Sequence, residues 1–334
     1  MDSAAGFLEA LCASFAVHGP GSFSVFGVRH VAERPDAGPL RAAECARTKL
    51  AEEIYARLHC RLPGNAFARE ARGGERVDAR EFTRLLSMAN AGRGSWQAGW
   101  LVRAVELDGR VVAESLGVRF WCSAAECRAG TEGVRAGAPV HVFVPKEYRQ
   151  LMPGFYMVTG DADDDLHGAP SLRVYWNVTA HGAVALAERL MRGLNAAQVA
   201  FRFKVPSDPR NFGRADAAVL YLHRERFSEV RSLLAEITAA ARPTLTRSTS
   251  AFVKTVAPGV GIAEDPGEGA SFGQHRSALL ADALLTDESA SADSVSARAT
   301  VVRHFLHVRG YAADALFLDP GSRDVYGWGR DAGA

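Results

Sequence analysis

The sequence predicts an α+β fold, in which a mixed or antiparallel sheet is flanked by helices. Strand-like and helix-like segments interleave along the 334 residues, and a hairpin signal occurs among them. A doubly wound parallel sheet would alternate strands and helices without such hairpins. Apolar residues make up 48% of the chain and charged residues 23%, which is typical of a globular protein with a core of normal size.

Two helices are predicted before residue 95. Apolar residues recur at helical spacing over 41–62, and a Pro-Gly pair follows the segment. Residues 65–77 are polar and are predicted to form a loop. Asp78 is predicted to cap a second helix that runs through Met88, because a short side chain with an oxygen acceptor favours the start of a helix.

The remaining elements are predicted from periodicity and turn chemistry. Residues 96–106 and 110–121 are predicted to be two strands joined by an Asp-Gly turn, which is a strong hairpin signal. Further strands are predicted over 140–144, 155–159, 172–178, 199–205 and 217–222. Helices are predicted over 183–194, 227–241, 271–285 and 293–308. The Pro- and Gly-rich residues 251–270 are predicted to form a long loop.

Composition excludes several classes of protein. A net charge of +1 argues against a general nucleic-acid binder. The chain has no apolar run long enough for a transmembrane helix and no basic N-terminal signal region, so we expect a cytoplasmic protein without membrane partners. Its five scattered cysteines are expected to be reduced thiols. No nucleotide-binding glycine motif and no metal-ligand spacing is found, so no cofactor or metal is expected.

Two alternating strands carry basic residues on one side. Arg173 and Tyr175 share one face of their predicted strand, and Arg202 and Lys204 share one face of another. Together they have two interpretations, either the floor of a basic pocket or the solvated face of a surface sheet.

A loop after the second strand adds Arg210 and Arg214. Arginine suits a phosphate group because its planar guanidinium donates two parallel, charge-assisted hydrogen bonds. Asp216 offers a structural alternative, in which it pairs with Arg214 within a turn.

Further basic residues lie near the start of a helix. Lys254 precedes a Gly-rich turn, and Ser271 is predicted to cap a helix whose first turn contains His275 and Arg276. Cations at a helix N-terminus conflict with the helix dipole, and a bound anion would relieve that conflict. This placement favours a functional role, although a lone histidine is more often structural.

Three runs of the sequence resemble a known family: LRVYWNVTAHGAVALAERLMRGLN, FRFKVPSDPRNFGRADAAVLYL and FVKTVAPGVGIAEDPGEGASFGQHRSALLADAL. They resemble the HopA-type effector family, which includes bacterial type III secreted effectors. It also includes actinobacterial proteins encoded with class V lanthipeptide and thioamitide pathways. The resemblance spans roughly residues 96–320 and is strongest over 171–285.

The resemblance implies a phosphoserine/phosphothreonine lyase with a fold similar to that of effector phosphothreonine lyases. Such a protein eliminates phosphate from a precursor (leader-core) peptide to leave dehydroalanine or dehydrobutyrine. The implied partners are that peptide, the Ser/Thr kinase of the same pathway, as a heterodimer, and a cyclase. We expect residues 96–325 to form the lyase domain and residues 1–95 an N-terminal helical region that binds the leader or a partner.

The resemblance and the residues together suggest roles for each group. Lys204 is the expected base, with Lys254 as the alternative, and His275 is the expected acid. Tyr175 is expected to orient the peptide or to hydrogen-bond the phosphate. The compact Lys-x-His motif of the effector lyases is absent because Pro206 occupies the histidine position, which leaves the acid open. The expected phosphate-binding residues are Arg173, Arg210, Arg214 and Arg276.

Two other classes of function remain open from the sequence. The first is a noncatalytic module that binds a peptide or a kinase, or a secreted effector of the same family. The second is a different enzyme, such as a transferase, that uses the same cations.

Overall fold

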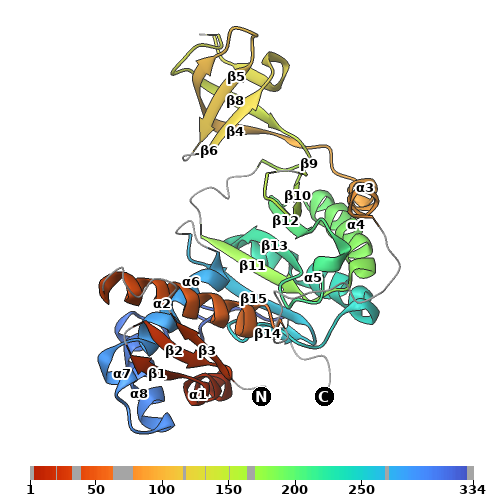
Figure 1. Cartoon of the computed structure of the whole chain (residues 1–334). Coiled ribbons are helices and arrows are strands. Elements are labelled where there is room, and N and C mark those ends of the chain that lie inside the picture. Colours follow the sequence, from red (N-terminus) through yellow and green to blue (C-terminus); the bar gives the residue numbers. More distant parts are fainter. Residues whose placement is uncertain are drawn as a thin grey trace.

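A computed structural model describes residues 4–19, 21–31, 39–62, 78–115, 118–131, 133–149, 151–163, 170–267 and 271–328. These residues form helices and antiparallel sheets, so the predicted α+β class is confirmed (Figure 1). Within the described part of the chain, the largest sheet has seven strands and lies at the centre of the molecule.

The seven-stranded sheet is antiparallel at every described strand pair. In spatial order its strands are β14 (Lys254–Ala257), β15 (Val260–Asp265), β11 (Ser171–Trp176), β13 (Ala218–His223), β12 (Phe201–Pro206), β10 (Phe155–Thr159) and β9 (Glu147–Tyr148). Aromatic and β-branched residues alternate along the central strands, which gives each strand one apolar face.

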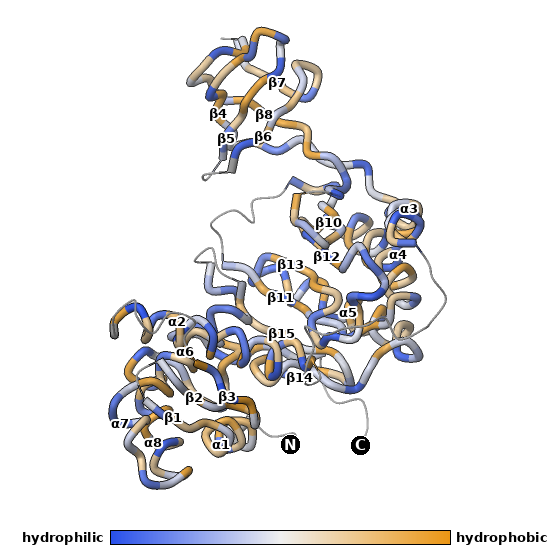
Figure 2. The backbone as a smooth tube through the Cα atoms, viewed as in Figure 1, coloured by the Kyte–Doolittle hydropathy of each residue, from blue (hydrophilic) through white to orange (hydrophobic). Residues whose placement is uncertain are grey.

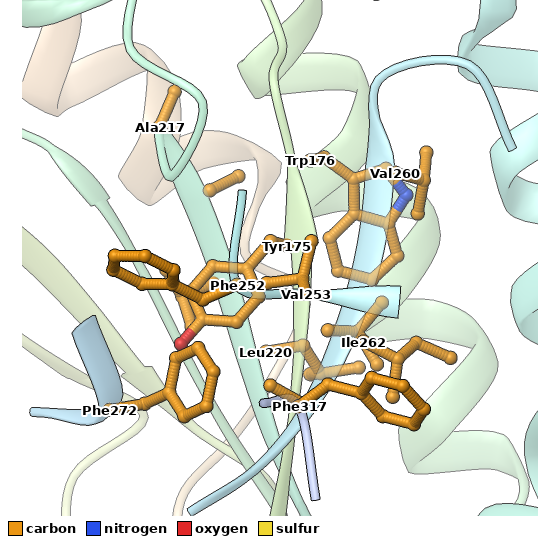
Figure 3. Close-up of a cluster of buried hydrophobic side chains, with 14 of the residues drawn as sticks. Tyr175, Trp176, Ala217, Leu220, Phe252, Val253, Val260, Ile262, Phe272 and Phe317 are labelled. Carbon is orange, nitrogen blue, oxygen red and sulfur yellow. The ribbon is translucent and has the colours of Figure 1, made fainter. Parts of the chain in front are cut away.

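Helices cover both faces of this sheet. On the apolar face lie α4 (Ala180–Ala196) and α5 (Phe227–Ala241), where the Trp176 indole donates a hydrogen bond to Thr238 at 3.0 Å. The other face is covered in part by the π-helical turn η2 (Tyr55–His59) and by α6 (Phe272–Leu284), and α2 (Pro39–Ile54) packs against α6. Figure 3 shows Tyr175 directed toward Phe272 and Phe252, away from Trp176.

The helix caps formed as the sequence predicts. The Asp78 side chain accepts a hydrogen bond from the backbone of Arg80 at the start of α3 (Ala79–Ala89). Ser271 and Gln274 form a reciprocal capping box at the start of α6. Short 3-10 turns are η3 (Ala124–Glu126), η4 (Pro209–Asn211), η5 (Arg224–Arg226) and η6 (Arg242–Thr244).

The N-terminal residues pack into the same core as the seven-stranded sheet. They form α1 (Ala4–Ser14), a three-stranded sheet of β1 (Ala16–Gly19), β2 (Ser22–Val25) and β3 (Val28–Val31), and then α2 and α3. The C-terminal helices α7 (Asp287–Ala290) and α8 (Val295–Val308) lie beside them (Figure 1). The division into residues 1–95 and 96–325 stays a prediction.

A small β-lobe stands apart from the rest of the molecule (Figure 1). Its strands, in spatial order, are β6 (Val118–Cys122), β5 (Val111–Ser115), β4 (Ser95–Val105), β8 (Pro139–Val144) and β7 (Cys127–Ala129). Hydrophobic and hydrophilic residues both occur along these strands (Figure 2), and the lobe has its own core around Trp100, Val102 and Val142. The hairpin predicted around the Asp-Gly turn is formed by β4 and β5 of this lobe.

Two predictions of secondary structure were wrong in part. The predicted strand over 110–121 is divided into β5 and β6. Residues 251–270 are not one long loop, because β14 and β15 form a hairpin within them. The loop predicted over 65–77 lies outside the described residues. Among the described residues, none of the helices combines the length and the apolar character that crossing a membrane requires.

Candidate functional site

One face of the seven-stranded sheet, here called the polar face, carries Arg173, Tyr175 and Lys204. Residues directly opposite each other on antiparallel strands have side chains on the same face. Arg173 lies opposite Tyr221, Tyr175 lies opposite Val219, and Val219 lies opposite Lys204. The strands therefore bring these three predicted site residues to one face, as their alternation predicts.

The polar face is more buried than a half-buried strand would suggest. Arg173 is 8% exposed and Tyr175 is 3% exposed, because η2 and α6 cover this end of the face. The Arg173 guanidinium donates hydrogen bonds to the Asp265 carboxylate, with Nε–Oδ2 at 2.8 Å. Within the described residues, the Tyr175 hydroxyl is buried without a hydrogen-bond partner. Its ring lies at 5.6 Å from that of His59 and 6.2 Å from that of Phe272.

Lys204 is half-buried beside apolar and aromatic groups. Its Nζ lies 4.0 Å from Met152 Sδ, 4.9 Å from the centre of the Phe155 ring and 5.8 Å from that of Tyr221. No carboxylate in the described parts of the chain forms an ion pair with it. Lys204 thus presents a cation on the polar face whose charge is not balanced directly by any acidic side chain that the structure describes.

A buried polar cluster lies close to Lys204. The Arg214 guanidinium donates two hydrogen bonds to the Asp216 carboxylate, with Nη2–Oδ2 at 2.8 Å. His59 Nε2 lies 3.6 Å from Asp216 Oδ2, and its Nδ1 lies 2.9 Å from the hydroxyl of Ser250. The Tyr55 hydroxyl lies 3.5 Å from the same carboxylate oxygen. The pairing of Arg214 with Asp216 is the structural alternative that the sequence left open.

The charges of Arg214 and Lys204 affect the pKa values of His59 and Asp216. Burial lowers the pKa of His59 to about 4, so its imidazole is neutral at pH 7. Burial alone would raise the pKa of Asp216, but Arg214 outweighs that effect and holds the pKa well below its usual range. The ammonium of Lys204 is close enough to lower the pKa of both groups further.

Arg210 and Lys254 lie away from this cluster. Arg210 is exposed in η4, and its guanidinium is paired with Asp208. Lys254 lies in β14 opposite Ile262, which places its side chain on the apolar side of the sheet. Its Nζ is paired with Asp324 at 2.7 Å. The structure therefore brings neither residue to the polar face.

His275 and Arg276 serve the packing of α6 against the C-terminal segment. Arg276 is fully buried and donates to the carbonyl oxygen of Leu316 at 2.8 Å and to Asp319 at 2.9 Å. Its Nη1 also lies 2.8 Å from His275 Nδ1, and the His275 ring lies 6.0 Å from that of Tyr311. A guanidinium only donates, so His275 Nδ1 is the accepting, unprotonated nitrogen.

The predicted cations differ in how their charges are balanced. Within the described residues, each cation predicted to be a base or a phosphate ligand, except Lys204, has an aspartate partner. These pairs are Arg173 with Asp265, Arg210 with Asp208, Arg214 with Asp216, Lys254 with Asp324 and Arg276 with Asp319. Lys204 is therefore the cation of this set that is best placed to meet an anionic ligand.

Sequence reasoning missed two residues of the site. Tyr221 lies on the polar face opposite Arg173 and Arg202, and its ring centre is 5.0 Å from Arg173 Cζ. The period-two pattern of β13 was available to predict that placement. His59 gave no signal, because a single histidine within an amphipathic helix has no distinguishing spacing.

A cavity of about 370 Å³ lies next to the polar face. It is lined by Ala162, Asp163, Pro170, Gln198, Ala200, His223, Glu225 and Arg226. His223 lies opposite Ser171 and shares the face of Arg173, but Lys204 does not line the cavity. The cavity is thus separate from the cluster around Lys204 and lies at the other end of β13.

Two solved structures similar to the chain are effector proteins from Pseudomonas syringae. The one from pv. tomato strain DC3000 has a TM-score of 0.47 and 16% identity, covering 81% of this chain and 94% of that chain. The one from pv. syringae strain 61 has a TM-score of 0.45 and 16% identity, covering 81% and 95%. A comparison with curated proteins found no match.

The family comparison covers the central sheet. Residues 147–316, just over half of the chain, match the HopA1 effector protein family. The matched range contains β9 to β15 and therefore the whole polar face, whereas η2 and the β-lobe lie outside it. The chain belongs to the HopA1 effector protein family.

Proposed function

We propose that this chain is a phosphoserine/phosphothreonine lyase that eliminates phosphate from a kinase-phosphorylated precursor peptide. The product is dehydroalanine or dehydrobutyrine, formed during lanthipeptide-type peptide maturation. The observation that carries the proposal is Lys204, a half-buried cation without a carboxylate partner among the described residues. An anion of the size of a phosphate group satisfies such a cation, and the amine is a base once it loses its proton.

The elimination balances with one base and one acid. Lys204 meets the phosphate as an ammonium and then loses its proton to water. Its free amine removes the Cα proton of the phosphorylated residue, and that electron pair forms the Cα–Cβ double bond. The bond between Cβ and the phosphate oxygen breaks, and phosphate leaves with its electrons. A proton donor neutralises the leaving group, and Lys204 returns its proton to water. Positive charge beside the leaving oxygen stabilises the transition state.

The neighbours of Lys204 suit this chemistry. Apolar and aromatic groups lie beside its amine, and Arg173 lies two strands away on the same face. Arg173 is held by Asp265, so its contribution is a fixed positive potential, not a mobile arm. Arg210, Lys254 and Arg276 take no part in this proposal, because their charges are balanced elsewhere.

We place the proton donor at Tyr221 and not at His275. The hydroxyl-bearing ring of Tyr221 is half-buried on the polar face, near both Lys204 and Arg173. His275 accepts a hydrogen bond from Arg276 on α6, which opposes the imidazolium form that a proton donor needs. Tyr221→Phe should lower elimination about 100-fold, in the range typical of a lost general acid, while His275→Gln should lower it only slightly.

The decisive experiment supplies the precursor peptide, its kinase and ATP, and follows the peptide mass with and without this chain. Elimination removes phosphoric acid from the phosphopeptide and leaves an alkene that reacts with thiols. The wild type should form this product. A phosphopeptide that stays intact, with the kinase active and the chain bound to the peptide, would instead indicate a noncatalytic binding module.

Two lysine variants make the residue assignment specific. Lys204→Met should abolish elimination, because it removes the base and the phosphate-binding cation together. Lys254→Met provides the matched control, since Lys254 lies on the other side of the sheet and is paired with Asp324. Elimination should persist in Lys254→Met, and the reverse pattern would assign the base to Lys254.

A further inference from the structure

The Asp216 carboxylate is the group that would compete with a substrate phosphate for the ammonium of Lys204. It is buried and negatively charged, and it lies two residues before β13, in which Val219 is directly opposite Lys204. The two charges are therefore close enough to influence each other. A buried carboxylate without other partners would draw the ammonium into an ion pair, since unpaired buried charges are costly. An ion-paired lysine neither binds phosphate nor acts readily as a base.

Three neighbours occupy this carboxylate and keep it in place. Arg214 holds both of its oxygens. His59 and Tyr55 approach Oδ2 from η2, at 3.6 Å and 3.5 Å. The Tyr55 hydroxyl also lies 3.3 Å from Arg214 Nη2, so these side chains form one connected cluster.

The local structure is built to hold His59 in this position. A Cβ atom added at Gly273 would lie 2.3 Å from His59 Cδ2, so only glycine at the start of α6 admits the imidazole ring. The ring also stacks on Tyr55 at 5.2 Å and on Phe252 at 6.0 Å. A π-helical turn such as η2 is rare and is frequently found at functional sites.

We infer that Arg214, aided by His59 and Tyr55 from η2, sequesters the Asp216 carboxylate and thereby leaves Lys204 available to a substrate phosphate. Arg214 is then a positioning residue and not a phosphate ligand. The inference rests on the proposed function and extends the site to η2, which lies outside the matched range 147–316.

The charge balance around Lys204 explains why Arg214 matters. Among the residues that the structure describes, the other titratable groups at this end of the polar face are Arg173 with Asp265, Tyr175, Tyr221, Arg202 and Cys60. Arg173 and Asp265 cancel each other. Lys204, Arg214 and Asp216 together carry one net positive charge, which Arg214→Leu removes and which Arg214→Leu with Asp216→Asn restores.

The test measures phosphopeptide affinity by fluorescence anisotropy, with a phosphoserine peptide of the precursor sequence, and the pH profile of elimination. Arg214→Leu should weaken binding about tenfold or more, because Lys204 turns to the released carboxylate. The rising limb of elimination should move to higher pH. The double variant Arg214→Leu/Asp216→Asn should recover both the affinity and the pH profile of the wild type to within a few fold.

A direct phosphate ligand predicts the opposite for the double variant. If Arg214 binds phosphate, the double variant binds as weakly as Arg214→Leu while unfolding cooperatively, and the inference is overturned. Arg214→Lys covers the case in which the leucine variants do not fold. Lysine keeps the positive charge but cannot donate two parallel hydrogen bonds as a guanidinium does. A KM for the phosphopeptide near the wild-type value supports the inference, and a KM raised more than about tenfold overturns it.

The measurement of phosphopeptide affinity separates this inference from the proposed function. If the wild type binds the phosphopeptide but eliminates nothing, the lyase proposal fails. The loss of binding in Arg214→Leu and its recovery in the double variant then still decide whether Arg214 sequesters Asp216. If Arg214→Leu binds as tightly as the wild type, the inference fails whatever the catalytic activity.

Discussion

The buried imidazole of His59 predicts how stability depends on pH. Burial lowers the pKa of His59 from its usual 6.5 to about 4 in the folded protein. Below pH 6.5 the unfolded chain takes up this proton while the folded protein resists it until about pH 4. The contribution of His59 to the free energy of unfolding is therefore fully present above pH 6.5 and is lost as the pH falls toward 4. The pKa difference corresponds to about 3 kcal/mol between pH 7.5 and pH 4.

His59→Gln isolates this contribution. Glutamine offers an amide to Ser250 and Asp216 but does not titrate, so the variant should lose about 3 kcal/mol less than the wild type over this pH range. Urea unfolding at half-unit steps from pH 4 to pH 7.5 provides both curves. In the folded protein Asp216 takes up its proton below this window, because its pKa lies below its usual range. Parallel curves for the two proteins would refute a neutral buried His59.

Three further predictions concern packing and thiol access. Gly273→Ala should destabilise the protein by about 1–3 kcal/mol in urea unfolding, because its Cβ would overlap the His59 ring. Gly130→Ala is the control and should change little, because open space surrounds its Cβ. Equal urea midpoints for the two variants would contradict the contact between Gly273 and His59. Arg276→Met should lower the free energy of unfolding by about 3–5 kcal/mol but leave phosphopeptide affinity intact, since Arg276 is buried against Asp319. A folded variant that has lost affinity for the phosphopeptide would instead indicate that Arg276 binds phosphate. Cys45 is the exposed cysteine of the five, so a thiol reagent should label one site in the native protein and five in denaturant; fast native labelling of a second thiol would contradict the burial of the others.

Local patterns in the sequence were sufficient for the geometry of the polar face. Period-two alternation in β11 and β12 placed Arg173, Tyr175 and Lys204 on one side of their strands, because side-chain direction depends only on position along a strand. The capping residues Asp78 and Ser271 were equally predictable, since a cap acts within one turn of its helix.

Long-range charge pairing was not predictable from one sequence. Arg173 and Asp265 are 92 residues apart, and Arg276 and Asp319 are 43 apart, so no spacing rule connects them. Arg214 and Asp216 are two residues apart, as are Arg210 and Asp208, and the first of these pairings was considered from the sequence. As a result, most of the cations that the sequence suggested would bind phosphate together are paired with aspartates, and Lys204 is the member of that set without a carboxylate partner among the described residues.

The hairpin of β14 and β15 was missed because its composition favours a loop. Gly259 forms a tight turn with φ of +76°, and β15 contains Gly261 packed against Val253. Glycines in these positions allow close packing within the sheet, although in a sequence they suggest irregular structure. The consequence for the site is direct, because this hairpin places Lys254 on the side of the sheet away from Lys204.

The most direct test of the central claim follows the mass of the kinase-phosphorylated precursor peptide with wild type and with Lys204→Met. The proposed mechanism predicts that the wild type releases phosphoric acid and leaves a thiol-reactive alkene, and that Lys204→Met, folded as judged by cooperative unfolding, leaves the phosphopeptide unchanged. Elimination at a similar rate by Lys204→Met would contradict the role of Lys204. An intact phosphopeptide with a bound wild-type protein would contradict the lyase itself.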